Sequence, residues 1–272
     1  MRFNCGITGH TGVLGSEIIK KKFDFRFSKF NGDLTKKKDI KKWINNNDIN
    51  IIFHFAAVVP THTVKDNLSY ANKVNVIGTK NLINETIKQK KLKWFLFSST
   101  SHVYNFSKKK ITEKAKTKPL SKYGLTKLKA EKYIQKKLKN KIPFCIARIF
   151  SFSHKKQASS FVIPTIIKKA KTKNKKIIFS NLEHYRDFLS TSDICNAIKI
   201  LYKNKATGIY NIGSGKKVLI SDIVKIISKK YKKKYLIKKN KNKTCLVADI
   251  KKIKKLNWKP KKNINKTIAE LL

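Results

Sequence analysis

The sequence predicts an α/β fold built on a doubly wound parallel sheet, with a smaller lobe towards the C-terminal end. Residues 49–57 and 94–97 are nearly continuous apolar runs, as expected of strands buried on both faces of a parallel sheet. Residues 9–15 form a glycine-rich turn between a first apolar run and a helical pattern. That order of strand, glycine turn and helix is typical of the start of such a sheet.

The length of 272 residues is enough for one large domain and a smaller lobe. An apolar content of 40% is ordinary for a globular protein and argues against disorder. We place the sheet domain at residues 1–150 and the smaller lobe at residues 151–272. Segments near 185–195 are expected to return to the first domain.

The net charge of +50 would suit nucleic acid, an anionic membrane or acidic substrates. However, of the 65 basic residues only four are the arginines on which nucleic-acid readers depend, namely Arg2, Arg26, Arg148 and Arg186. The excess of lysine, asparagine and isoleucine is typical of an AT-rich genome, so we interpret the lysines as solvated surface. We expect neither nucleic acid nor a membrane as a partner, although a positive field still attracts a nucleotide.

The four cysteines are far apart in the sequence and contain no Cys-x-x-Cys pair; they are Cys5, Cys145, Cys195 and Cys245. This spacing indicates neither a metal site nor a disulfide framework, which suits a reducing cytosol. No apolar run approaches the roughly 18 residues of a membrane span. Because the N-terminus passes directly into the glycine motif, we expect no signal peptide and a cytoplasmic location.

The first strand is expected at residues 2–8, and the helix after it includes Ser16. Between them, Gly9 permits a tight turn, Gly12 lets the backbone approach a pyrophosphate, and Gly15 lets the helix pack on the strand. Backbone N–H groups at such a turn bind phosphate. The spacing Gly-x-x-Gly-x-x-Gly therefore predicts a dinucleotide site rather than an empty turn.

The second strand is expected at residues 25–29, and it ends without the acid that usually holds a ribose 2′-hydroxyl. Arg26, Ser28 and Lys29 could instead receive a 2′-phosphate, which favours NADP. The alternative is that these are ordinary surface residues. Asp24 would indicate NAD only if the strand were shifted in register.

Further along, Asp33 follows the second strand and could accept a hydrogen bond from an adenine amino group. A helix is expected at residues 36–46, before the apolar run of residues 49–57. The small pair Ala56 and Ala57 at the end of that run lets a flat ligand lie against the backbone, whereas His54 is interpreted as a core histidine with its hydrogen bonds satisfied.

The strand at residues 94–97 runs into a cluster of hydroxyl side chains at residues 98–101. Ligands bind at the carboxyl ends of the strands in open parallel sheets. Thr100 could donate a hydrogen bond to a substrate oxygen there, and the alternative is a Ser/Thr-rich turn without a ligand. Asn75 is expected to begin a helix with a buried stripe.

Tyr123 and Lys127 lie four residues apart in a stretch that reads as a loop leading into a helix. On a helix this spacing places both side chains on one face. An ammonium group close to a phenol lowers the pKa of the phenol from about 10, so that it can exchange a proton near neutral pH. In a lysine-rich chain the pair is a weak signal alone and gains weight from the motifs before it.

These motifs, taken together, resemble a known family. In order they are Thr8-Gly-x-x-Gly-x-x-Gly15, His54-Phe-Ala-Ala57, Asn75-Val-x-Gly-Thr79, Ser98-Ser-Thr-Ser-x-Val-Tyr104, Tyr123-Gly-x-x-Lys127, Arg148-Ile-Phe150, His184-Tyr-Arg-Asp-Phe-Leu189 followed by Asp193-Ile194, Tyr210-Asn-Ile-Gly213, and Leu256-Asn-Trp-x-Pro260. The chain resembles an extended short-chain dehydrogenase/reductase of the NAD-dependent epimerase/dehydratase family, which modifies nucleotide sugars, and the resemblance covers nearly all of it. It implies a Rossmann-type doubly wound sheet with a smaller C-terminal substrate-binding lobe.

The resemblance also implies roles at matching positions. Tyr123 would be the catalytic acid/base, Lys127 would lower its pKa and hold the nicotinamide ribose, and Thr100 would orient the sugar oxygen. The implied cofactor contacts are Gly9, Thr11, Gly12, Val13, Leu14, Gly15, Asp33, Leu34, Phe55, Ala56, Ala57, Asn75, Tyr123 and Lys127. The implied substrate contacts are Thr100, Ser101, His102 and Arg186, with the Arg186 guanidinium clamping a diphosphate.

The chain departs from the family pattern at three places. Ser101 and His102 stand where family dehydratases carry Asp-Glu, so 4,6-dehydration is not expected. Asn105 replaces a glycine after Tyr104, which implies a differently shaped loop. Residues 154–156, His-Lys-Lys, replace Gly-Pro-Gly, which puts the substrate-loop contacts in doubt.

The expected reaction is the reduction of a 4-keto nucleotide sugar by hydride from NADPH or NADH, with Tyr123 as proton donor. The main alternative is a nucleotide-sugar 4-epimerase, of the UDP-glucose 4-epimerase type, with tightly bound NAD. A non-enzymatic nucleic-acid binder would not need Thr100, Tyr123 and Lys127, and its binding would weaken steeply with salt. No metal is expected. The sugar, the nucleotide base and the choice between monomer and homodimer stay open.

Cofactor preference gives the first testable prediction. Because the second strand lacks the acid that repels a 2′-phosphate, we expect NADPH to bind more tightly than NADH. One charge-assisted contact contributes about 1.5–3 kcal/mol, or roughly tenfold or more in affinity. Lys29→Glu should narrow or reverse the difference between the two dissociation constants, measured at moderate salt. Equal affinities, or a preference for NADH, in the unmodified protein would reject the NADP interpretation and favour the epimerase.

Overall fold

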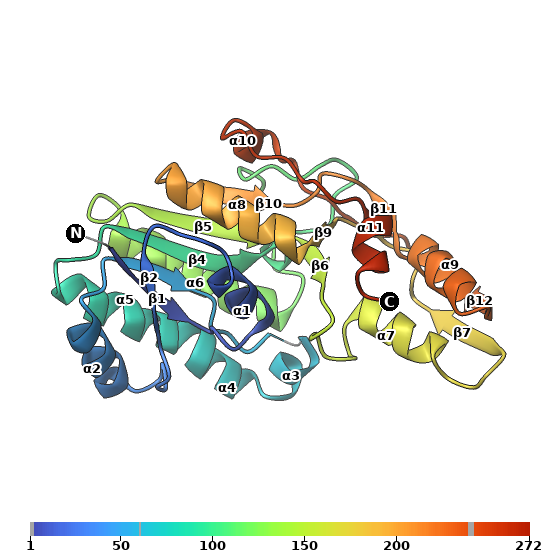
Figure 1. The fold of residues 1–272 in the computed structure, drawn as a ribbon, viewed down its shortest axis with the longest axis horizontal. Coiled ribbons are helices and arrows are strands. Elements are labelled where there is room, and N and C mark those ends of the chain that lie inside the picture. Colours follow the sequence, from blue (N-terminus) through green and yellow to red (C-terminus); the bar gives the residue numbers. More distant parts are fainter. Residues whose placement is uncertain (1–2, 60, 239–241) are drawn as a thin grey trace. The chain divides into compact units, whose positions relative to one another are not determined.

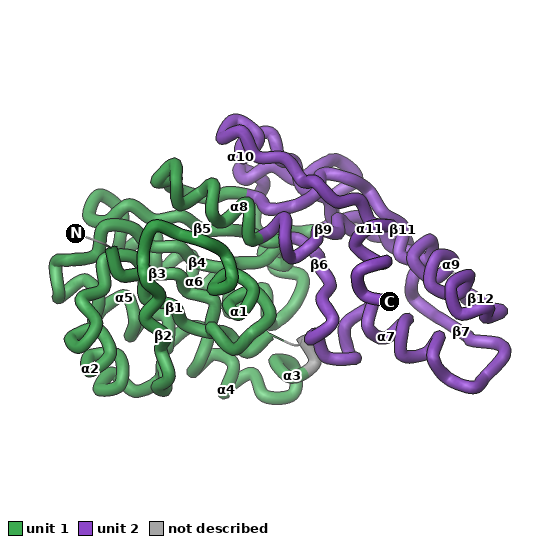
Figure 2. Tube along the Cα trace, in the orientation of Figure 1, with its two compact units in different colours: residues 1–105, 116–149, 195–210 green, residues 106–115, 150–194, 211–272 purple. Residues whose placement is uncertain are grey.

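The chain divides into two units (Figure 2), and the computed structural model describes residues 3–59, 61–238 and 242–272 of it, without the side chains of residues 61 and 62. Unit 1 comprises residues 1–105, 116–149 and 195–210, and unit 2 comprises residues 106–115, 150–194 and 211–272. The chain crosses from unit 1 to unit 2 between residues 149 and 150, next to the domain boundary expected after residue 150. The later segment that belongs to unit 1 is 195–210, and residues 106–115 belong to unit 2.

Unit 1 is built on a six-stranded sheet with the strand order β10-β5-β4-β3-β1-β2. Its strands are β1 (Asn4–Thr8), β2 (Arg26–Lys29), β3 (Ile51–His54), β4 (Trp94–Thr100), β5 (Phe144–Ile149) and β10 (Gly208–Ile212). From β2 to β5 every neighbouring pair is parallel. The predicted doubly wound parallel sheet of Rossmann type is thereby confirmed.

The remaining elements up to β5 connect these strands. They are α1 (Val13–Ile19), α2 (Lys37–Asn47), α3 (Thr61–Asp66), α4 (Leu68–Asn72), the π-helix η1 (Lys73–Gly78), α5 (Thr79–Lys88), the 3₁₀ turn η2 (Ser101–Val103) and α6 (Lys122–Leu138). Figure 1 shows α2, α5 and α6 side by side along one face of the sheet. α8 (Thr191–Lys203) begins in unit 2 and continues into unit 1.

Apolar side chains fill the space on both faces of the sheet. On one face, Ile44 of α2, Leu82 of α5 and Ile134 of α6 share a buried cluster with Phe95 and Phe97 of β4. On the other face, the ring of Tyr202 in α8 packs edge-on against Phe53, with 6.2 Å between centroids, and Trp94, with 5.9 Å. The central strands are therefore buried on both sides, as their continuous apolar sequences predict.

Two strands differ in length from the expectation. β3 ends at His54 rather than at residue 57, and the N–H of Phe55 makes the last hydrogen bond to β1, donating to Thr8 O at 3.1 Å. β4 extends to Thr100, since residues 98–100 continue to pair with residues 147–149 of β5. The expected hydroxyl cluster therefore lies within the strand and leads directly into η2.

Unit 2 is assembled from small sheets and helices. The sheets have the orders β11-β8-β13, β12-β7 and β6-β9. The strands are β6 (Ser151–Ser153), β7 (Lys176–Ser180), β8 (Tyr185–Arg186), β9 (Phe188–Ser190), β11 (Val218–Leu219), β12 (Lys234–Lys238) and β13 (Cys245–Leu246), and the helices are α7 (Val162–Ala170), α9 (Ile220–Lys230), α10 (Lys251–Lys254) and α11 (Ile264–Ala269). Buried residues of α7, β7, α9 and α11 share one hydrophobic cluster.

Asp187 joins two loops of unit 2 through its buried carboxylate. Its oxygens accept hydrogen bonds from the N–H and Oγ of Ser214, both at 2.6 Å, and from the N–H groups of Gly215 at 2.9 Å and Ala248 at 3.1 Å. Burial raises the pKa of Asp187, and these four hydrogen bonds oppose the shift.

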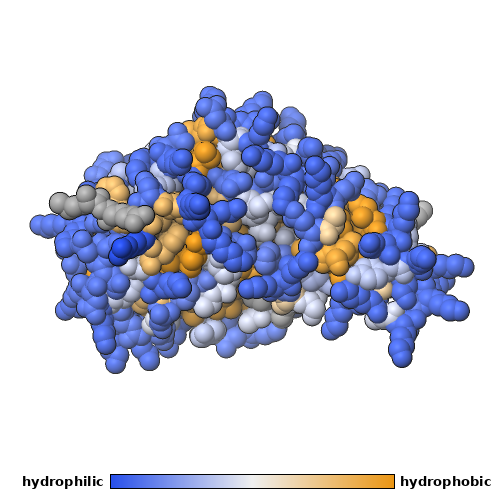
Figure 3. Space-filling model, in the orientation of Figure 1, coloured by the Kyte–Doolittle hydropathy of each residue, from blue (hydrophilic) through white to orange (hydrophobic). Residues whose placement is uncertain are grey.

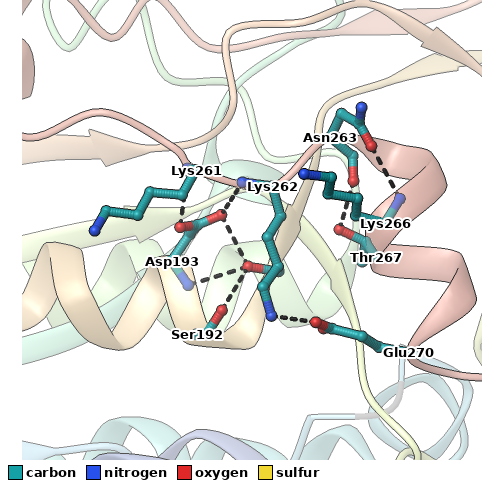
Figure 4. Close-up of polar contacts among 9 residues, drawn as sticks. Ser192, Asp193, Lys261, Lys262, Asn263, Lys266, Thr267 and Glu270 are labelled. Carbon is teal, nitrogen blue, oxygen red and sulfur yellow. Dashed lines mark hydrogen bonds and ion pairs between the residues drawn. The ribbon is translucent and has the colours of Figure 1, made fainter.

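A second buried carboxylate, that of Asp193, holds the C-terminal segment (Figure 4). It accepts from the backbone N–H groups of Lys261 at 3.0 Å and Lys262 at 3.1 Å, and from Ser190 Oγ at 2.9 Å. Away from the Asp193 carboxylate, Lys262 Nζ also forms an ion pair with Glu270, whose side chain is half exposed. Asp193 therefore fixes the backbone of the segment, while the Lys262–Glu270 pair is a surface contact.

The surface is dominated by polar side chains. Figure 3 shows hydrophilic residues over most of the face that it presents, in keeping with the interpretation of the lysines as solvated surface. None of the helices in the described residues combines the length and the hydropathy needed to cross a bilayer.

We expect Asp193→Ala to loosen the C-terminal segment, because it removes the carboxylate that accepts from two partly buried backbone N–H groups, and hydrogen bonds to a charged group contribute about 1.5–3 kcal/mol each. Limited trypsin digestion should then cut after Lys261 or Lys262 several times faster than in the unmodified protein. Glu270→Gln is the matched control: it removes only the surface ion pair and should leave the rate nearly unchanged. Equal cleavage rates in the two variants would contradict this assignment.

Candidate active site

The glycine turn after β1 is a close-packed loop at the point where the strand order reverses. In the sheet β1 lies between β2 and β3. The chain therefore passes from β1 to β2 on one side and then crosses to β3 on the other side of β1. Gly9 has a φ of +70°, a conformation that favours glycine. A Cβ on Gly15 would lie 2.2 Å from Gly9 O, whereas a Cβ on Gly12 would meet only Gly9 O, at 3.3 Å. Gly9 and Gly15 are therefore required by the turn, and the space beside Gly12 is left open.

The loop after β3 lies against this turn. Ala56 N donates to Thr8 Oγ1 at 3.3 Å, and a Cβ on Gly9 would lie only 2.5 Å from Ala56 N. Phe55 is buried, while Ala56 and Ala57 are half-buried. The structure therefore brings the expected cofactor contacts of the two loops together at the carboxyl ends of β1 and β3.

His54 is confirmed as a core histidine. Its Nδ1 lies 2.6 Å from Thr8 Oγ1 and its Nε2 lies 2.8 Å from Thr79 Oγ1. Burial, aided by the positive charge of Lys127, lowers the pKa of His54 to about 3. The imidazole is therefore neutral at physiological pH and links β1, β3 and α5.

Asn75 lies within the π-helix η1 rather than at the start of an α-helix. Its Oδ1 accepts from Val58 N at 2.7 Å, and its Nδ2 donates to Val58 O at 3.0 Å and to Thr126 Oγ1 at 3.1 Å. π-helical turns are frequent at functional sites. Asn75 thus ties the loop after β3 to the turn of α6 that carries Lys127.

Thr100 ends β4 and caps the 3₁₀ turn that follows. Its Oγ1 accepts from His102 N at 3.2 Å, which leaves the hydroxyl proton available to a ligand. The Nδ1 of His102 lies 3.2 Å from Ser121 Oγ, and its ring packs edge-on against Tyr123 with 6.2 Å between centroids. Ser101 is buried. Thr100, His102 and Tyr123 therefore belong to one side-chain cluster.

Helix α6 begins close to η2 because of its local sequence. Ser121 caps the helix by accepting from Gly124 N at 3.0 Å, and Leu120 N donates to His102 O at 3.0 Å. A Cβ on Gly124 would lie 2.2 Å from His102 O, so only glycine permits this approach. The glycine after Tyr123 therefore allows the first turn of α6 to pack on η2.

Lys127 is the central charged group of the site. Its side chain is 2% exposed, and its Nζ lies 4.1 Å from the centroid of the Phe97 ring. Among the residues that the structure describes, none accepts a hydrogen bond from this Nζ. Burial lowers the pKa of Lys127 to about 7, and the charge of Glu131 opposes the shift. An ammonium with three donors so placed fits the hydroxyl groups of a cofactor ribose.

Tyr123 differs from the expectation in the direction of its pKa. The sequence predicts a pKa lowered by Lys127, whereas in the structure burial raises the pKa of this half-buried phenol. The physical reason is the desolvation of the phenol on burial, which disfavours its charged form.

The strand β2 ends without an acid, as expected. Arg26 and Lys29 are both exposed, and Ser28 is half-buried. Asp33 Oδ1 accepts from Thr35 N at 2.8 Å, and this bond is the main reason why the pKa of Asp33 is lowered.

Leu34 is 6% exposed and belongs to the hydrophobic core. The contact of Asp33 and Leu34 with an adenine stays a prediction, and the burial of Leu34 leaves its backbone as the part that could make it. Thr11 is exposed, and Val13 and Leu14 are half-buried at the start of α1.

Arg186, the expected diphosphate clamp, lies in unit 2. Its Nη1 donates to Tyr185 O at 2.7 Å, Thr244 O at 3.3 Å and Thr244 Oγ1 at 3.1 Å. Its guanidinium carbon is 5.1 Å from the centroid of the Phe106 ring. The side chain is thus fixed within its own unit, and its contact with a substrate stays a prediction.

Sequence reasoning missed a buried ionic cluster next to Lys127. Arg148 Nη2 lies 2.6 Å from Glu131 Oε2, and Ser99 Oγ donates to Glu131 Oε1. Ser99 was expected among hydroxyls facing a ligand, but it turns towards α6 instead. One signal could have indicated the cluster: an acid four residues after Lys127 on the same face of a helix.

With this geometry established, the chain can be compared with known proteins. Residues 5–213 match the model of the NAD dependent epimerase/dehydratase family. The chain belongs to this family.

Individual members and solved structures agree with that assignment. A Methanocaldococcus jannaschii protein named as a candidate UDP-glucose 4-epimerase is 27% identical over 98% of this chain and 96% of its own length. The structure of RMD from Pseudomonas aeruginosa complexed with NADPH has a TM-score of 0.88 at 19% identity, covering 99% of this chain and 98% of its own. MoeE5 in complex with UDP-glucose and NAD has a TM-score of 0.84 at 20% identity, covering 98% and 97%. At these identities the two structures establish the likeness of fold.

The glycine turn of this epimerase/dehydratase family member gives a matched pair of variants. Gly12→Val should fold, because its Cβ would meet only Gly9 O, at 3.3 Å, which a shift of a few tenths of an ångström relieves. Its methyl groups should obstruct a pyrophosphate and raise the dissociation constants of NADH and NADPH at least tenfold. Gly15→Ala should destabilise the fold, because its Cβ would overlap Gly9 O. Fluorescence titration and thermal unfolding measure the two effects. Unchanged binding of both cofactors to Gly12→Val would mean that they bind elsewhere.

Proposed function

We propose that this family member is a nicotinamide-dependent oxidoreductase of nucleotide sugars that reduces a 4-keto sugar. The observation that carries the proposal is the buried Lys127 ammonium, which shares a helix face with Tyr123 and has no acceptor among the described residues. A buried ammonium whose hydrogen-bond donors have no acceptor is costly for a purely structural protein. Its placement beside a phenol and the Thr100 hydroxyl suits an enzyme that moves a proton.

The protein residues would divide the work as follows. Tyr123 Oη gives its proton to the oxygen of the sugar as a ketone becomes an alcohol, and Thr100 Oγ1 donates a hydrogen bond that orients this oxygen. Lys127 Nζ binds ribose hydroxyls and stabilises the phenolate that remains on Tyr123. A bound nicotinamide cofactor supplies the hydride chemistry. The open space at Gly12 and the tethered side chain of Asn75 fit the binding of such a group.

The choice of a reductase over an epimerase rests on β2. Exposed Arg26 and Lys29, without an acid at the end of the strand, favour a 2′-phosphate and hence NADPH, a cofactor of reductions. The alternative is a nucleotide-sugar 4-epimerase with tightly held NAD. It is favoured by the Methanocaldococcus jannaschii relative, which matches along nearly the whole chain. Ser101 and His102 offer no acid pair for dehydration.

A nucleotide sugar is the proposed substrate in either case. The names of the relatives refer to UDP-, dTDP-, ADP- and GDP-linked sugars, and MoeE5 has been crystallised with UDP-glucose. The guanidinium of Arg186, stacked on Phe106 and held by Thr244, is the proposed contact for the diphosphate.

Two measurements distinguish these reactions. Mass spectrometry of the purified protein identifies any cofactor that remains bound, and tightly retained NAD would favour the epimerase. A panel of nucleotide sugars and their 4-keto derivatives is then assayed with NADPH and NADH. Oxidation of NADPH that depends on a 4-keto sugar supports the reductase, and interconversion of two sugars without net oxidation of cofactor rejects it.

Tyr123→Phe should abolish most turnover while leaving cofactor binding nearly intact, because it removes the proton donor and keeps the ring. General acid–base catalysis contributes roughly 10²–10⁴ in rate. The comparison is kcat together with the dissociation constant of the cofactor. A variant that retains more than about a tenth of the rate would exclude Tyr123 as the acid.

A further inference from the structure

The ionic cluster beside Lys127 joins helix α6 to two strands of the sheet. Arg148 Nε lies 3.1 and 3.2 Å from the two oxygens of Glu131, and Nη2 lies 2.6 Å from Oε2. Ser99 and Arg148 are partners in the register of β4 and β5, so both reach the carboxylate from the same face of the sheet. Glu131 is 0% exposed and Arg148 is 3% exposed. The carboxylate therefore has a fixed position below the surface.

Glu131 follows Lys127 by one turn of α6, on the same face of the helix. Its negative charge acts on the Lys127 ammonium and favours the charged form, while burial favours the neutral form. The surrounding elements supply further polar or titratable side chains, none of them a carboxylate: His54 from β3, Ser99 from β4, Arg148 from β5 with Tyr104 against its guanidinium, Asn75 from η1 and Tyr123 from α6 itself. Among the described residues, Glu131 is thus the counter-charge of Lys127.

A structural role alone does not account for an ion pair at this place. Apolar side chains of similar volume often hold a helix on a sheet as well as a buried ion pair does, or better. The pair does, however, place a negative charge close to a lysine that is otherwise desolvated. Arg148 and Ser99 hold that charge in place one helical turn from Lys127 by donating to both oxygens of the carboxylate.

We propose that Glu131 and Arg148 are positioning residues for the proton-transfer site: Glu131 keeps Lys127 charged beside Tyr123, and Arg148 fixes Glu131 in the orientation that does so. The inference rests on the proposed function for its catalytic meaning. Its physical content, that Glu131 sets the charge state of Lys127, holds for the folded protein without substrate.

The test uses stability, because the charge on a buried lysine is linked to folding. The pKa of Lys127 is about 7 in the folded protein and about 10.4 in an unfolded chain. Below pH 7 Lys127 is protonated in both the folded and the unfolded state, so the free-energy penalty of burying its charge is constant. Between the two pKa values only the unfolded state binds the proton, so the stability of the folded protein rises with pH. Lys127→Met removes the penalty. Its stabilising effect should therefore be level below about pH 7 and shrink above that pH.

The same substitution is then made in a Glu131→Gln background. If Glu131 is the counter-charge, its loss lowers the pKa of Lys127 further, by about one unit or more. The stabilising effect of Lys127→Met should then keep growing below pH 7 and level off at a correspondingly lower pH. Urea unfolding from pH 5 to pH 9 gives the stabilising effect of Lys127→Met in both backgrounds. The bend is the pH at which this effect, plotted against pH, changes from sloping to level. A bend at the same pH in both would overturn the proposal.

Two further variants guard against misfolding and a merely structural effect. If the Glu131→Gln variant does not fold because Arg148 has lost its partner, the background is Glu131→Gln with Arg148→Met, which removes both charges. This double change should shift the bend less than Glu131→Gln alone, because the positive charge of Arg148 is lost as well. Glu131→Asp keeps the negative charge and should return the bend towards its original pH. Ser99→Ala should leave the bend unshifted, because it removes a hydrogen bond and no charge. A shift in Ser99→Ala as large as in Glu131→Gln would reject the role of charge.

Turnover gives a separate readout. With Lys127 less readily protonated, the alkaline limb of the pH–rate profile in Glu131→Gln should move to lower pH by the same interval as the bend. If no nucleotide sugar is turned over, the proposed function fails while the unfolding measurement still decides whether Glu131 controls Lys127.

Discussion

The burial of one ammonium group, that of Lys127, is the constraint on which the architecture of unit 1 depends. An ammonium can be held at 2% exposure only if the helix that carries it is pressed onto the sheet and its charge is compensated. Gly124 allows the first turn of α6 to approach η2, Thr126 is tied to Asn75, and Glu131 binds two strands. The packing of α6 and the proposed proton transfer therefore depend on the same contacts.

Acidic residues are scarce in this chain, 15 against 65 basic ones, and three of the buried ones have a defined task. Asp187 and Asp193 bind backbone N–H groups and hold loops of unit 2 in place. Glu131 instead binds side chains and compensates a charge in unit 1. Of these three carboxylates, that of Glu131 is the one paired with a buried cation, Arg148.

Features encoded by short spacings could be predicted from the sequence: the strands, the glycine turn, the placing of Tyr123 and Lys127 on one helix, and the core position of His54. Features that depend on contacts between distant segments could not. The Glu131–Arg148 pair joins residues 17 positions apart on helix α6 and strand β5, through a packing of helix on sheet that no local pattern specifies. The π-helix around Asn75 and the raised pKa of Tyr123 likewise follow from tertiary packing and burial.

In the part of the chain that the structure describes, β2 is an edge of the sheet, since β1 is its neighbour and the strand order ends there. Edge strands offer unpaired N–H and C=O groups to strands of other chains, and proteins prevent such pairing by keeping them short and charged. β2 has four residues and exposes a cation at each end, Arg26 and Lys29. The two side chains that we associate with cofactor choice therefore also protect the sheet from intermolecular β-pairing, and replacing both by neutral residues would remove a barrier to aggregation.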